Sequence, residues 1–497
     1  MNDVILRRTV VSNGNENNDA AISARRYQQQ RIDHWDHLAR KLDGWTGFGT
    51  YYHKLLEHYY KLLIPSGLRI LEIGCGQGDL LAALDPAVGV GVDFSPEMIQ
   101  RASKRYPRLR FVQADAHELV IDELFDIIIM SDLANDLWDV QAVFEKTAAM
   151  VHPGTRLIIN TYSRLWEIPL KICKALGLSK PTLEQNWLTV EDITNLLRLT
   201  NYDVIKQTKE IFLPLYLPLI SGLANHVLVK IWPFSHAALT NFIVARPSFS
   251  PVRTSSTPRP LASVVVPACN EAGNIEGIFT RTPEMGGGTE LVFVEGHSED
   301  DTFTVIKSAV AKYPNIKCKL LKQTGKGKGD AVRLGFANAG GDILMILDAD
   351  LTVPPEDLPR FYEALISRKG EFVNGVRLVY PREHQAMSFF NLVGNKFFSL
   401  AFSWVLGQSI KDTLCGTKVL WKRDYDLIAD NRAYFGDFDP FGDFDLLFGA
   451  VKLNLKIVDL PIRYRDRTYG RTNIHRWQHG WLLFKMLVFA AKRIKFT

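Results

Sequence analysis

The sequence is poor in cysteine, and the cysteines it has are scattered. There are 5 among 497 residues, with no Cys-x-x-Cys pair and no cluster of cysteine and histidine. This pattern argues against a disulfide framework and against a structural zinc site. A reducing, cytoplasmic environment is therefore expected.

The chain also lacks a strong charge bias and a long apolar run. Its net charge of +5 is too small to predict a nucleic-acid partner, and it suits anionic substrates or a membrane surface equally well. No uninterrupted apolar run reaches the roughly 18 residues that a membrane-spanning helix needs. The N-terminus has no long apolar core of the kind found in secretory signals.

Two segments come closest to membrane-active sequence. Residues 211–234, "IFLPLYLPLISGLANHVLVKIWPF", contain two prolines before a polar Asn-His pair, and residues 480–496, "GWLLFKMLVFAAKRIKF", end in a basic cluster. Both can be buried core or a domain contact. The alternative is a peripheral contact at the inner face of the membrane, in which Lys492, Arg493 and Lys495 face anionic lipid.

A stretch rich in proline, serine and threonine divides the chain. Residues 247–262, "PSFSPVRTSSTPRPLA", have the composition of a linker. On either side an apolar strand leads into a glycine-bearing turn, which predicts two α/β domains. The expected divisions are a disordered N-terminus (1–30), a first domain (31–247), a linker (248–260), a second domain (261–477) and an apolar, basic C-terminal helix (478–497).

The first domain opens with "LRILEIGCGQGDLLAAL" (68–84), which predicts a strand, a glycine turn and a helix. Glycines at 74, 76 and 78 permit positive φ and close approach to a ligand. The dinucleotide fingerprint requires glycine at position 79, where this chain has Asp79. An acid at the helix start would repel a pyrophosphate, so a cofactor without phosphates at this point is favoured.

Acidic residues follow the next three predicted strands. Asp93 ends "GVGVD" and can accept hydrogen bonds from both ribose hydroxyls, while Asp115 ends "LRFVQAD" and can bind an adenine edge. Asp132 ends "FDIIIMSD". Each acid alone could be a helix or turn cap, but the three in order behind a glycine turn favour a nucleoside site.

These motifs, "LEIGCGQG", "VDFSPEMI" and "QADAHEL", resemble the class I S-adenosylmethionine-dependent methyltransferases over residues 45–247. The resemblance implies a Rossmann-like seven-stranded sheet that ends in an antiparallel hairpin, with S-adenosylmethionine as cofactor. It assigns Glu72, Gly74, Gly76 and Gly78 to the methionine part of the cofactor, Asp93 to the ribose, and Asp115 and Ala116 to the adenine.

The methyl acceptor is not specified by the sequence. Acceptor and sulfur must be aligned with the bond that breaks, and a hydroxyl acceptor also needs a base. The available side chains are those of His117, Asp132, Asp136, His152 and Tyr162. An alternative is that this domain binds cofactor or glycan without catalysis.

The second domain contains "GDILMILDADLTVPPEDL" (341–358), in which an apolar run ends in Asp348 and Asp350. In extended chain, residues i and i+2 point the same way, so the two carboxylates can converge. Such oxygens suit Mg²⁺ or Mn²⁺, which would neutralise a diphosphate leaving group. Without a cation, two buried acids would protonate or repel each other.

Around this pair the sequence carries "SVVVPACNEAGNIEGIF", "ELVFVEGHSEDDT", "TGKGKGDAVRLGF" and "LPIRYRDRTYGRTNI" in order. Together they resemble family 2 glycosyltransferases with the GT-A nucleotide-sugar fold, and in particular the dolichyl- or polyprenyl-phosphate sugar transferases, over residues 261–477. The resemblance implies a nucleotide sugar as donor and a metal on Asp348 and Asp350. It assigns nucleotide-sugar contacts to Pro267, Asn270, Glu271, Glu295, Lys326 and Asp348. Because Glu295 to His297 depart from the family pattern, the base stays open between uracil and guanine.

The acceptor side of this second site is implied by the same resemblance. Arg377, Arg467 and Arg471 are assigned to phosphate, and Asp412, Asp443 and Asp445 to the catalytic region. The arginines could instead form a solvated face, and the acids could be helix N-terminal charges. A glycan hydroxyl would need Asp443 or Asp445 as base, whereas a polyprenyl phosphate is already an anion and needs none.

The two resemblances together predict a bifunctional enzyme of glycan or glycolipid biosynthesis. One half would transfer methyl groups, and the other would transfer a sugar with inversion and with a metal ion. The alternative is a glycosyltransferase that carries a non-catalytic, cofactor-binding module.

Overall fold

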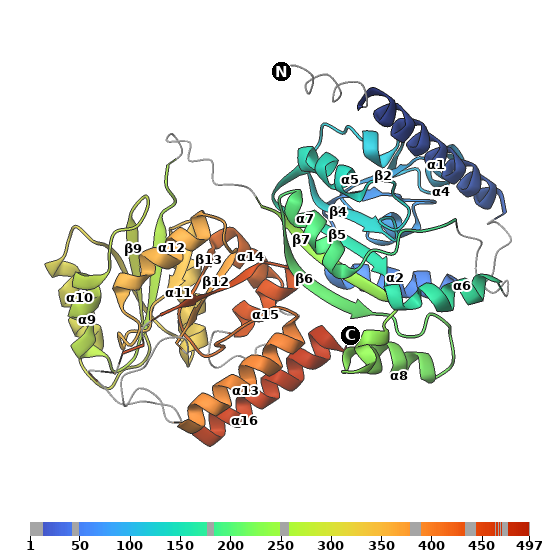
Figure 1. Cartoon of the computed structure of the whole chain (residues 1–497). Helices are drawn as coiled ribbons and strands as arrows, with labels where there is room; N and C mark the ends of the chain where they lie inside the picture. Colours follow the sequence, from blue (N-terminus) through green and yellow to red (C-terminus); the bar gives the residue numbers. More distant parts are fainter. Residues whose placement is uncertain are drawn as a thin grey trace, which may run out of the picture. The chain divides into compact units, whose positions relative to one another are not determined.

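The computed structural model describes residues 13–41, 49–175, 183–248, 258–377, 389–432, 444–462, 464–465, 467, 469 and 476–496. The chain divides into two compact units, Met1–Ser248 and Phe249–Thr497. Each unit is an α/β domain built on one seven-stranded sheet with helices on its faces (Figure 1). The predicted fold class is therefore confirmed for both halves.

The sheet of the first unit has the strand order β3-β2-β1-β4-β5-β7-β6. Strands β1 to β5 are parallel, while β7 runs antiparallel to both β5 and β6. The predicted closing hairpin is thus confirmed. The strands are β1 (Arg69–Ile73), β2 (Val88–Asp93), β3 (Arg110–Gln113), β4 (Phe125–Ser131), β5 (Val151–Tyr162), β6 (Tyr202–Glu210) and β7 (Thr240–Pro247).

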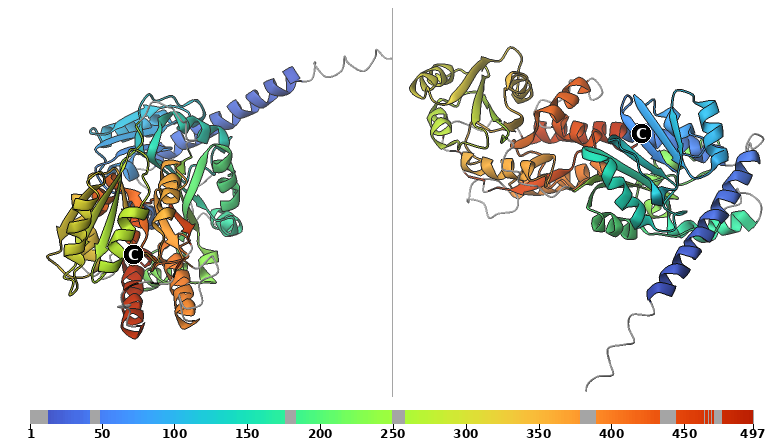
Figure 2. Two further views of the ribbon diagram at one scale, coloured as in Figure 1. Left: turned by 90° about the vertical axis from the view of Figure 1, so that its left-hand side faces the viewer. Right: turned by 90° about the horizontal axis from the view of Figure 1, so that it is seen from above.

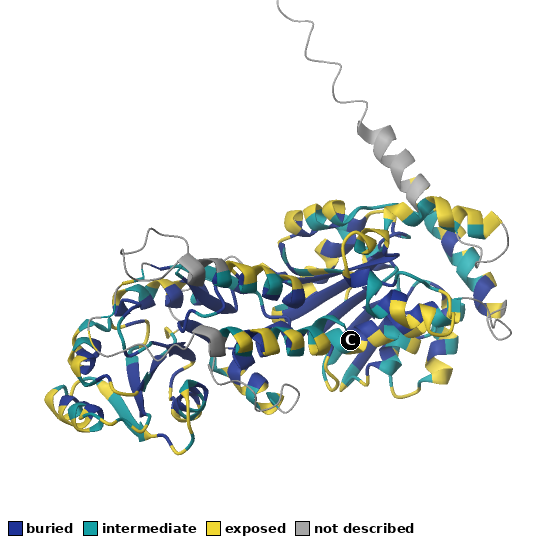
Figure 3. Cartoon of the chain, turned by 90° about the horizontal axis from the view of Figure 1, so that it is seen from below, coloured by how far each residue is buried: buried dark blue, intermediate teal, exposed yellow. Residues whose placement is uncertain are grey.

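The central strands of this sheet are buried because they are apolar on both faces, as parallel strands covered by helices must be (Figure 3). Tyr59, Tyr60 and Phe242 form an aromatic cluster between α2 and β7. The helices are α2 (Gly49–Leu63), α3 (Asp79–Ala83), α4 (Pro96–Arg105), α5 (Val140–Thr147), α6 (Glu167–Ala175), α7 (Val190–Leu199) and α8 (Ile220–His226).

The N-terminal helix α1 (Asn13–Lys41) begins inside the stretch for which composition predicts disorder, so residues 13–30 differ from that expectation. Its second half contacts the domain: Leu38 and Ala39 are buried, and the Arg31 guanidinium lies 3.8 Å from the Asp136 carboxylate. These contacts stabilise a helix that its own polar sequence does not favour.

The sheet of the second unit has the order β10-β9-β8-β11-β13-β12-β14. Strands β8 to β11 are parallel, and β13 runs antiparallel between β11 and β12. The strands are β8 (Ala262–Ala268), β9 (Thr289–Glu295), β10 (Lys317–Lys322), β11 (Ile343–Ile346), β12 (Phe372–Val376), β13 (Lys418–Trp421) and β14 (Ile457–Pro461).

Helices α13 (Phe389–Leu406) and α16 (Arg476–Ala490) lie side by side in this unit (Figures 1 and 2). A π-helical turn, Ala491–Lys495, follows α16. The other helices are α9 (Ile275–Arg281), α10 (Thr302–Lys312), α11 (Lys328–Asn338), α12 (Leu358–Ile366), α14 (Lys422–Asp430) and α15 (Phe444–Lys452). Among the residues described, no helix has the length and apolarity needed to cross a bilayer.

The two apolar segments noted in the sequence are each partly exposed. In residues 211–234, Ile211 and Val229 are buried, whereas Tyr216, Leu219 and Trp232 are exposed. Helices α13 and α16 also expose apolar side chains, which are Phe397, Leu400, Trp404, Trp481, Phe484 and Val488. Of these, Trp404 contacts Lys495 of the basic C-terminal turn.

Candidate active sites

The glycine turn after β1 has the conformation that its sequence predicts. Gly74, Gly76 and Gly78 have φ of +76°, +52° and +77°, which glycine adopts without the strain that a side chain would impose. A Cβ at Gly74 would lie 2.8 Å from Leu133, and one at Gly78 would lie 2.6 Å from Phe111. The turn is therefore closely packed against the domain at Gly74 and Gly78, whereas a Cβ at Gly76 would meet nothing within 4 Å.

Two acids, Glu72 and Asp93, flank this turn. Burial raises the pKa of Glu72 to about 8, and its Oε2 has no hydrogen-bond partner among the described residues. Asp93 accepts hydrogen bonds from the amides of Gly76 and Ser95, both at 2.9 Å, so it ties the end of β2 to the turn. Each of its oxygens keeps a lone pair for a ligand hydroxyl.

Asp115 and Ala116 lie at the end of the next strand. Burial would raise the pKa of Asp115, but hydrogen bonds from the amide and ring of His117, both at 2.7 Å, lower it. Ala116 is buried in the short 3-10 helix that Asp115 caps. S-adenosylmethionine carries an ammonium group, ribose hydroxyls and an adenine amino group, all of which donate hydrogen bonds. The unpartnered Glu72 oxygen and the strand-end carboxylates can accept such bonds, and the glycine turn leaves room for the ligand, so these residues fit the cofactor.

Helix α1 adds residues to this edge that sequence patterns do not reveal. The Gln28 side chain donates to Asp115, and the hydroxyl of Ser95 donates to Asp36. Nothing in the polar composition of this helix marks these two positions, since their partners lie 87 and 59 residues further along the chain.

A cluster of hydrogen-bonded side chains surrounds Asp132, directly after β4. Its carboxylate accepts from the hydroxyl of Tyr52 at 3.0 and 3.1 Å, from the amide of Asn160 at 2.5 Å and from the hydroxyl of Tyr162 at 3.3 Å. Tyr60 donates to the other end of the Asn160 amide, at 2.7 Å. Burial raises the pKa of Asp132 to about 7, although these donors lower it.

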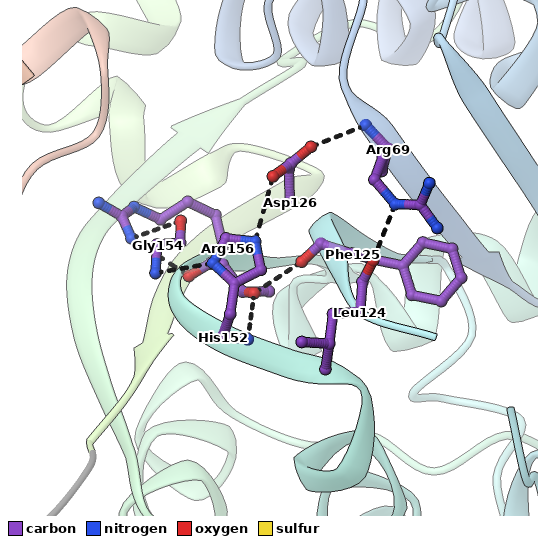
Figure 4. Close-up of polar contacts among 8 residues, drawn as sticks. Arg69, Leu124, Phe125, Asp126, His152, Gly154 and Arg156 are labelled. Atoms are coloured by element: carbon purple, nitrogen blue, oxygen red, sulfur yellow. Dashed lines mark hydrogen bonds and ion pairs between the residues drawn. The ribbon is translucent and has the colours of Figure 1, made fainter. Parts of the chain in front are cut away.

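His152 lies at the opposite edge of the same sheet. Figure 4 shows its ring against Asp126, which also accepts from the backbone amide of Arg69. Asp126 is the second residue of β4 and Asp132 follows its last, so a rise of six residue steps separates the two acids by about 20 Å. His152 is therefore far from the glycine turn.

The other three candidates for the base of methyl transfer are His117, Asp136 and Tyr162, and each already contacts other side chains. Both ring nitrogens of His117 are used, one by Asp115 and one by the amide of Asp139 at 3.1 Å. Asp136 faces Arg31. Tyr162 donates to Asp132, so the geometry groups it with that acid.

In the second unit, Asp348 and Asp350 follow β11 and each faces a cation. Lys328 Nζ lies 2.7 Å from an Asp348 oxygen, and Arg467 donates to Asp350 at 2.8 Å. Burial would raise the pKa of Asp348, but the charge of Lys328 lowers it. The Thr352 hydroxyl donates to Asp350 at 2.7 Å, which holds that carboxylate in place.

The remaining predicted nucleotide contacts, apart from Lys326, lie in or directly after β8 and at the end of β9. Glu271 is buried and lies 3.4 Å from Arg467, and burial raises its pKa to about 7. Asn270 accepts from the Glu299 amide at 2.7 Å, and Glu295 accepts from the Ser298 amide at 2.6 Å. Pro267 is in β8, and Lys326 is exposed in the loop before α11.

Arg377 and Asp412, expected to contact phosphate and to take part in catalysis, form a buried bidentate pair. The two hydrogen bonds are 2.8 and 2.9 Å long, and the amides of Arg377 and Leu414 donate to the same carboxylate at 3.1 and 3.0 Å. Although burial would raise the pKa of Asp412, Arg377 lowers it. The Arg377 guanidinium also lies 5.3 Å from the ring centre of Tyr464.

Asp445 is buried at the start of α15 and pairs with Arg333 at 3.3 Å and Arg432 at 3.4 Å. Its carboxylate is thus engaged in two ion pairs. Asp443 and Arg471 lie outside the described residues.

Asp348 and Asp350 offer hard carboxylate oxygens of the kind that bind Mg²⁺ or Mn²⁺. Within the described residues there is no group of three or more His, Cys, Asp or Glu side chains that could hold a metal by itself. Magnesium commonly binds through one or two carboxylates and completes its shell with substrate phosphates and water. The donor set fits such an ion.

Comparison with known families defines the class of each half. Residues 64–205 match a methyltransferase domain, and residues 263–403 match glycosyl transferase family 2. The chain therefore joins a methyltransferase domain to a family 2 glycosyl transferase domain, which confirms both resemblances drawn from the sequence.

Among curated relatives, the dolichol-phosphate mannosyltransferase of Pyrococcus furiosus is 28% identical over 43% of this chain and 58% of its own length. The dolichol-phosphate mannosyltransferase of Saccharomyces cerevisiae is 36% identical over 21% and 40%. The undecaprenyl-phosphate 4-deoxy-4-formamido-L-arabinose transferase of Aeromonas hydrophila is 27% identical over 43% and 62%. The chain thus spans less than two thirds of each of these relatives.

Similar solved structures include the N-methyltransferase NodS of Bradyrhizobium japonicum in complex with S-adenosyl-L-homocysteine. It is 16% identical, with 40% of this chain and 89% of that chain covered and a TM-score of 0.29. Another is magnesium protoporphyrin IX methyltransferase from Synechocystis, also with S-adenosyl-L-homocysteine bound, at 17% identity, 45% and 85% coverage and a TM-score of 0.27.

Proposed function

We propose that the second domain transfers a sugar, with inversion, from a nucleotide sugar to a polyprenyl phosphate. The first domain transfers a methyl group from S-adenosylmethionine to a related glycan or glycolipid. The array of Asp348, Asp350, Lys328 and Arg467 at one edge of the second sheet carries the first part of this proposal. The named activities of the relatives, which are transferases acting on dolichyl or undecaprenyl phosphate, support the acceptor class.

The engagement of the predicted catalytic acids favours a phosphate over a hydroxyl as acceptor. Of the three predicted acids, the two that the structure describes are engaged: Asp445 is held by two arginines and Asp412 by one, so neither offers an unpaired carboxylate for removing a proton. A polyprenyl phosphate is already an anion and needs no base. Arg377 is partly buried in its pair with Asp412, and its charge also acts on Asp348, so it can contribute to holding that phosphate.

The residues of the second site can bind a metal ion and stabilise the charge of the leaving group. A divalent ion on Asp348 and Asp350 would neutralise the nucleoside diphosphate as it leaves. Lys328 and Arg467 lie against the same carboxylates and can share that negative charge. The basic turn after α16, with Lys492, Arg493 and Lys495, would hold this domain at an anionic membrane surface where the lipid acceptor resides.

Sugar transfer tests this proposal directly. The full chain is incubated with Mn²⁺, labelled UDP- or GDP-sugars, and either undecaprenyl phosphate or undecaprenol. Labelled lipid is expected only with undecaprenyl phosphate and with only one of the two nucleotides, UDP- or GDP-sugar. The product should disappear when the metal is chelated and in Asp350→Asn. The control Asp357→Asn, at an acid that ends the following 3-10 helix and is paired with Arg360, should retain transfer. Transfer to undecaprenol with equal efficiency would refute the acceptor assignment.

A further inference from the structure

Asp132 stands out among the side chains that the sugar-transfer reaction does not use. It has φ of +53°, a conformation that costs energy for a residue with a side chain and that often marks functional positions. It keeps some accessible surface, although its donors Tyr52 and Asn160 are buried. A carboxylate that only caps a turn does not need three side-chain donors, whereas this one accepts from Tyr52, Asn160 and Tyr162.

The register of the sheet places this acid beside the glycine turn. Ile73 pairs with Met130, so Gly74 and Ser131 continue from neighbouring positions of β1 and β4. The side chain of Leu133, the residue after Asp132, lies against Gly74. Asp132 is therefore at the methionine end of the proposed cofactor site, whereas Asp93 and Asp115 belong to its nucleoside end.

We infer that Asp132, positioned by Tyr52, Asn160 and Tyr162, is the catalytic base of a methyl-acceptor site that takes an un-ionised alcohol. This inference rests on the methyl transfer proposed above. The hydroxyl oxygen attacks the methyl carbon, the carbon–sulfur bond breaks with its electron pair going to sulfur, and the hydroxyl proton passes to an Asp132 oxygen. The products are a methyl ether, S-adenosylhomocysteine and protonated Asp132, which returns the proton to water.

The chemistry of the cluster favours an alcohol over an amine. A carboxylate stabilises a nearby ammonium, which has no lone pair to attack with, whereas an alcohol enters uncharged. A base is also most effective when its pKa lies close to the working pH, as burial makes that of Asp132. The groups that face this acid are Tyr52 and Tyr60 of α2, Asn160 and Tyr162 of β5, Thr240 of β7, and Asp136, whose charge is offset by Arg31.

The test compares Asp132→Asn with Asp126→Asn, which changes an acid at the far end of the same strand. Calorimetry with S-adenosylhomocysteine should give the same affinity for both variants and the unchanged chain. Labelled methyl transfer is then measured with methyl mannoside and methyl glucoside as alcohol probes and with glucosamine as amine probe. Transfer to the alcohols should fall by about 10²- to 10⁴-fold in Asp132→Asn and stay within twofold in Asp126→Asn.

The pH dependence separates a catalytic from a structural role. The rate should rise with pH through about 7, the pKa that burial gives Asp132, and Tyr52→Phe should move this rise to higher pH because it removes a donor that lowers that pKa. An unchanged rise in Tyr52→Phe, transfer by Asp132→Asn at the normal rate, or transfer to glucosamine alone would overturn the inference. So would cofactor binding without transfer to either alcohol. Failure to bind S-adenosylhomocysteine at all would instead refute the proposed function of this domain.

Discussion

The buried pair of Arg377 and Asp412 gives a prediction whose size follows from the structure. Replacing Arg377 with methionine keeps much of its volume but leaves a fully buried carboxylate without its bidentate partner. Breaking a buried ion pair in this way costs about 3–5 kcal/mol of unfolding free energy. The amides of Arg377 and Leu414 still donate to Asp412, so the lower half of this range is expected.

The loss should depend on pH in a defined direction. In the unchanged chain Arg377 lowers the pKa of Asp412, so the stability from this pair is present above the unfolded pKa of about 4 and lost as the pH falls through the lower folded value. In Arg377→Met the orphaned acid is expected to bind a proton readily because it is buried. The stability difference between the two proteins should therefore be largest near pH 7 and shrink towards pH 4.

Scanning calorimetry at several pH values measures this difference on the transition of the second domain. The double variant Arg377→Met, Asp412→Leu should regain most of the lost stability, because no buried charge remains. It should not regain sugar transfer if Arg377 binds the acceptor phosphate. A loss below 1 kcal/mol at pH 7 in the single variant, or a loss that grows towards pH 4, would contradict the reasoning.

Two further predictions concern the other site residues. In Gly416→Ala the new Cβ would lie 2.2 Å from an Asp348 oxygen and 2.3 Å from Lys328 Nζ, so sugar transfer should fall at least tenfold in the labelled-lipid assay; Gly394→Ala in α13, where nothing lies within 4 Å, should retain it. Asp132→Asn should raise the unfolding free energy of the first domain at pH 8 by up to about 4 kcal/mol. Because burial raises the pKa of Asp132 to about 7 in the folded domain, ionisation of this acid destabilises the folded domain as the pH rises towards 7, and asparagine does not ionise. Calorimetric curves that differ as much at pH 4 as at pH 8 would disprove this second prediction.

The sheets and the glycine turn could be predicted from the sequence because their signals are local. Apolar runs such as that of β4 identify buried strands, and positive φ at Gly74 follows from the residue type. The acids at strand ends could be placed on one edge because parallel strands share a direction. These parts depend on residues within a few positions of one another.

The side-chain clusters could not be predicted because their members come from distant segments. Asp132 meets Tyr52 from 80 residues before it, and Tyr52 meets Thr240 from 188 residues after it. Asp445, which the sequence assigns to the catalytic region, is paired with Arg333 across 112 residues and with Arg432. No periodicity or motif marks such pairings, since they are set by how strands and helices are ordered in space.

Helix α1 has a consequence for the order in which the first domain is completed during synthesis. It leaves the ribosome before its partners, because Asp115, which Gln28 contacts, is 87 residues away, and Asp136, whose backbone oxygen accepts from Tyr27, is 109 residues away. At 5–20 residues per second these partners are made roughly 5–20 s later. An isolated polar helix is marginally stable in water, so α1 is stabilised only once the strands that carry its partners have been made. The contacts that α1 makes with the nucleoside end of the cofactor edge can therefore form only after β3 and β4 have been made.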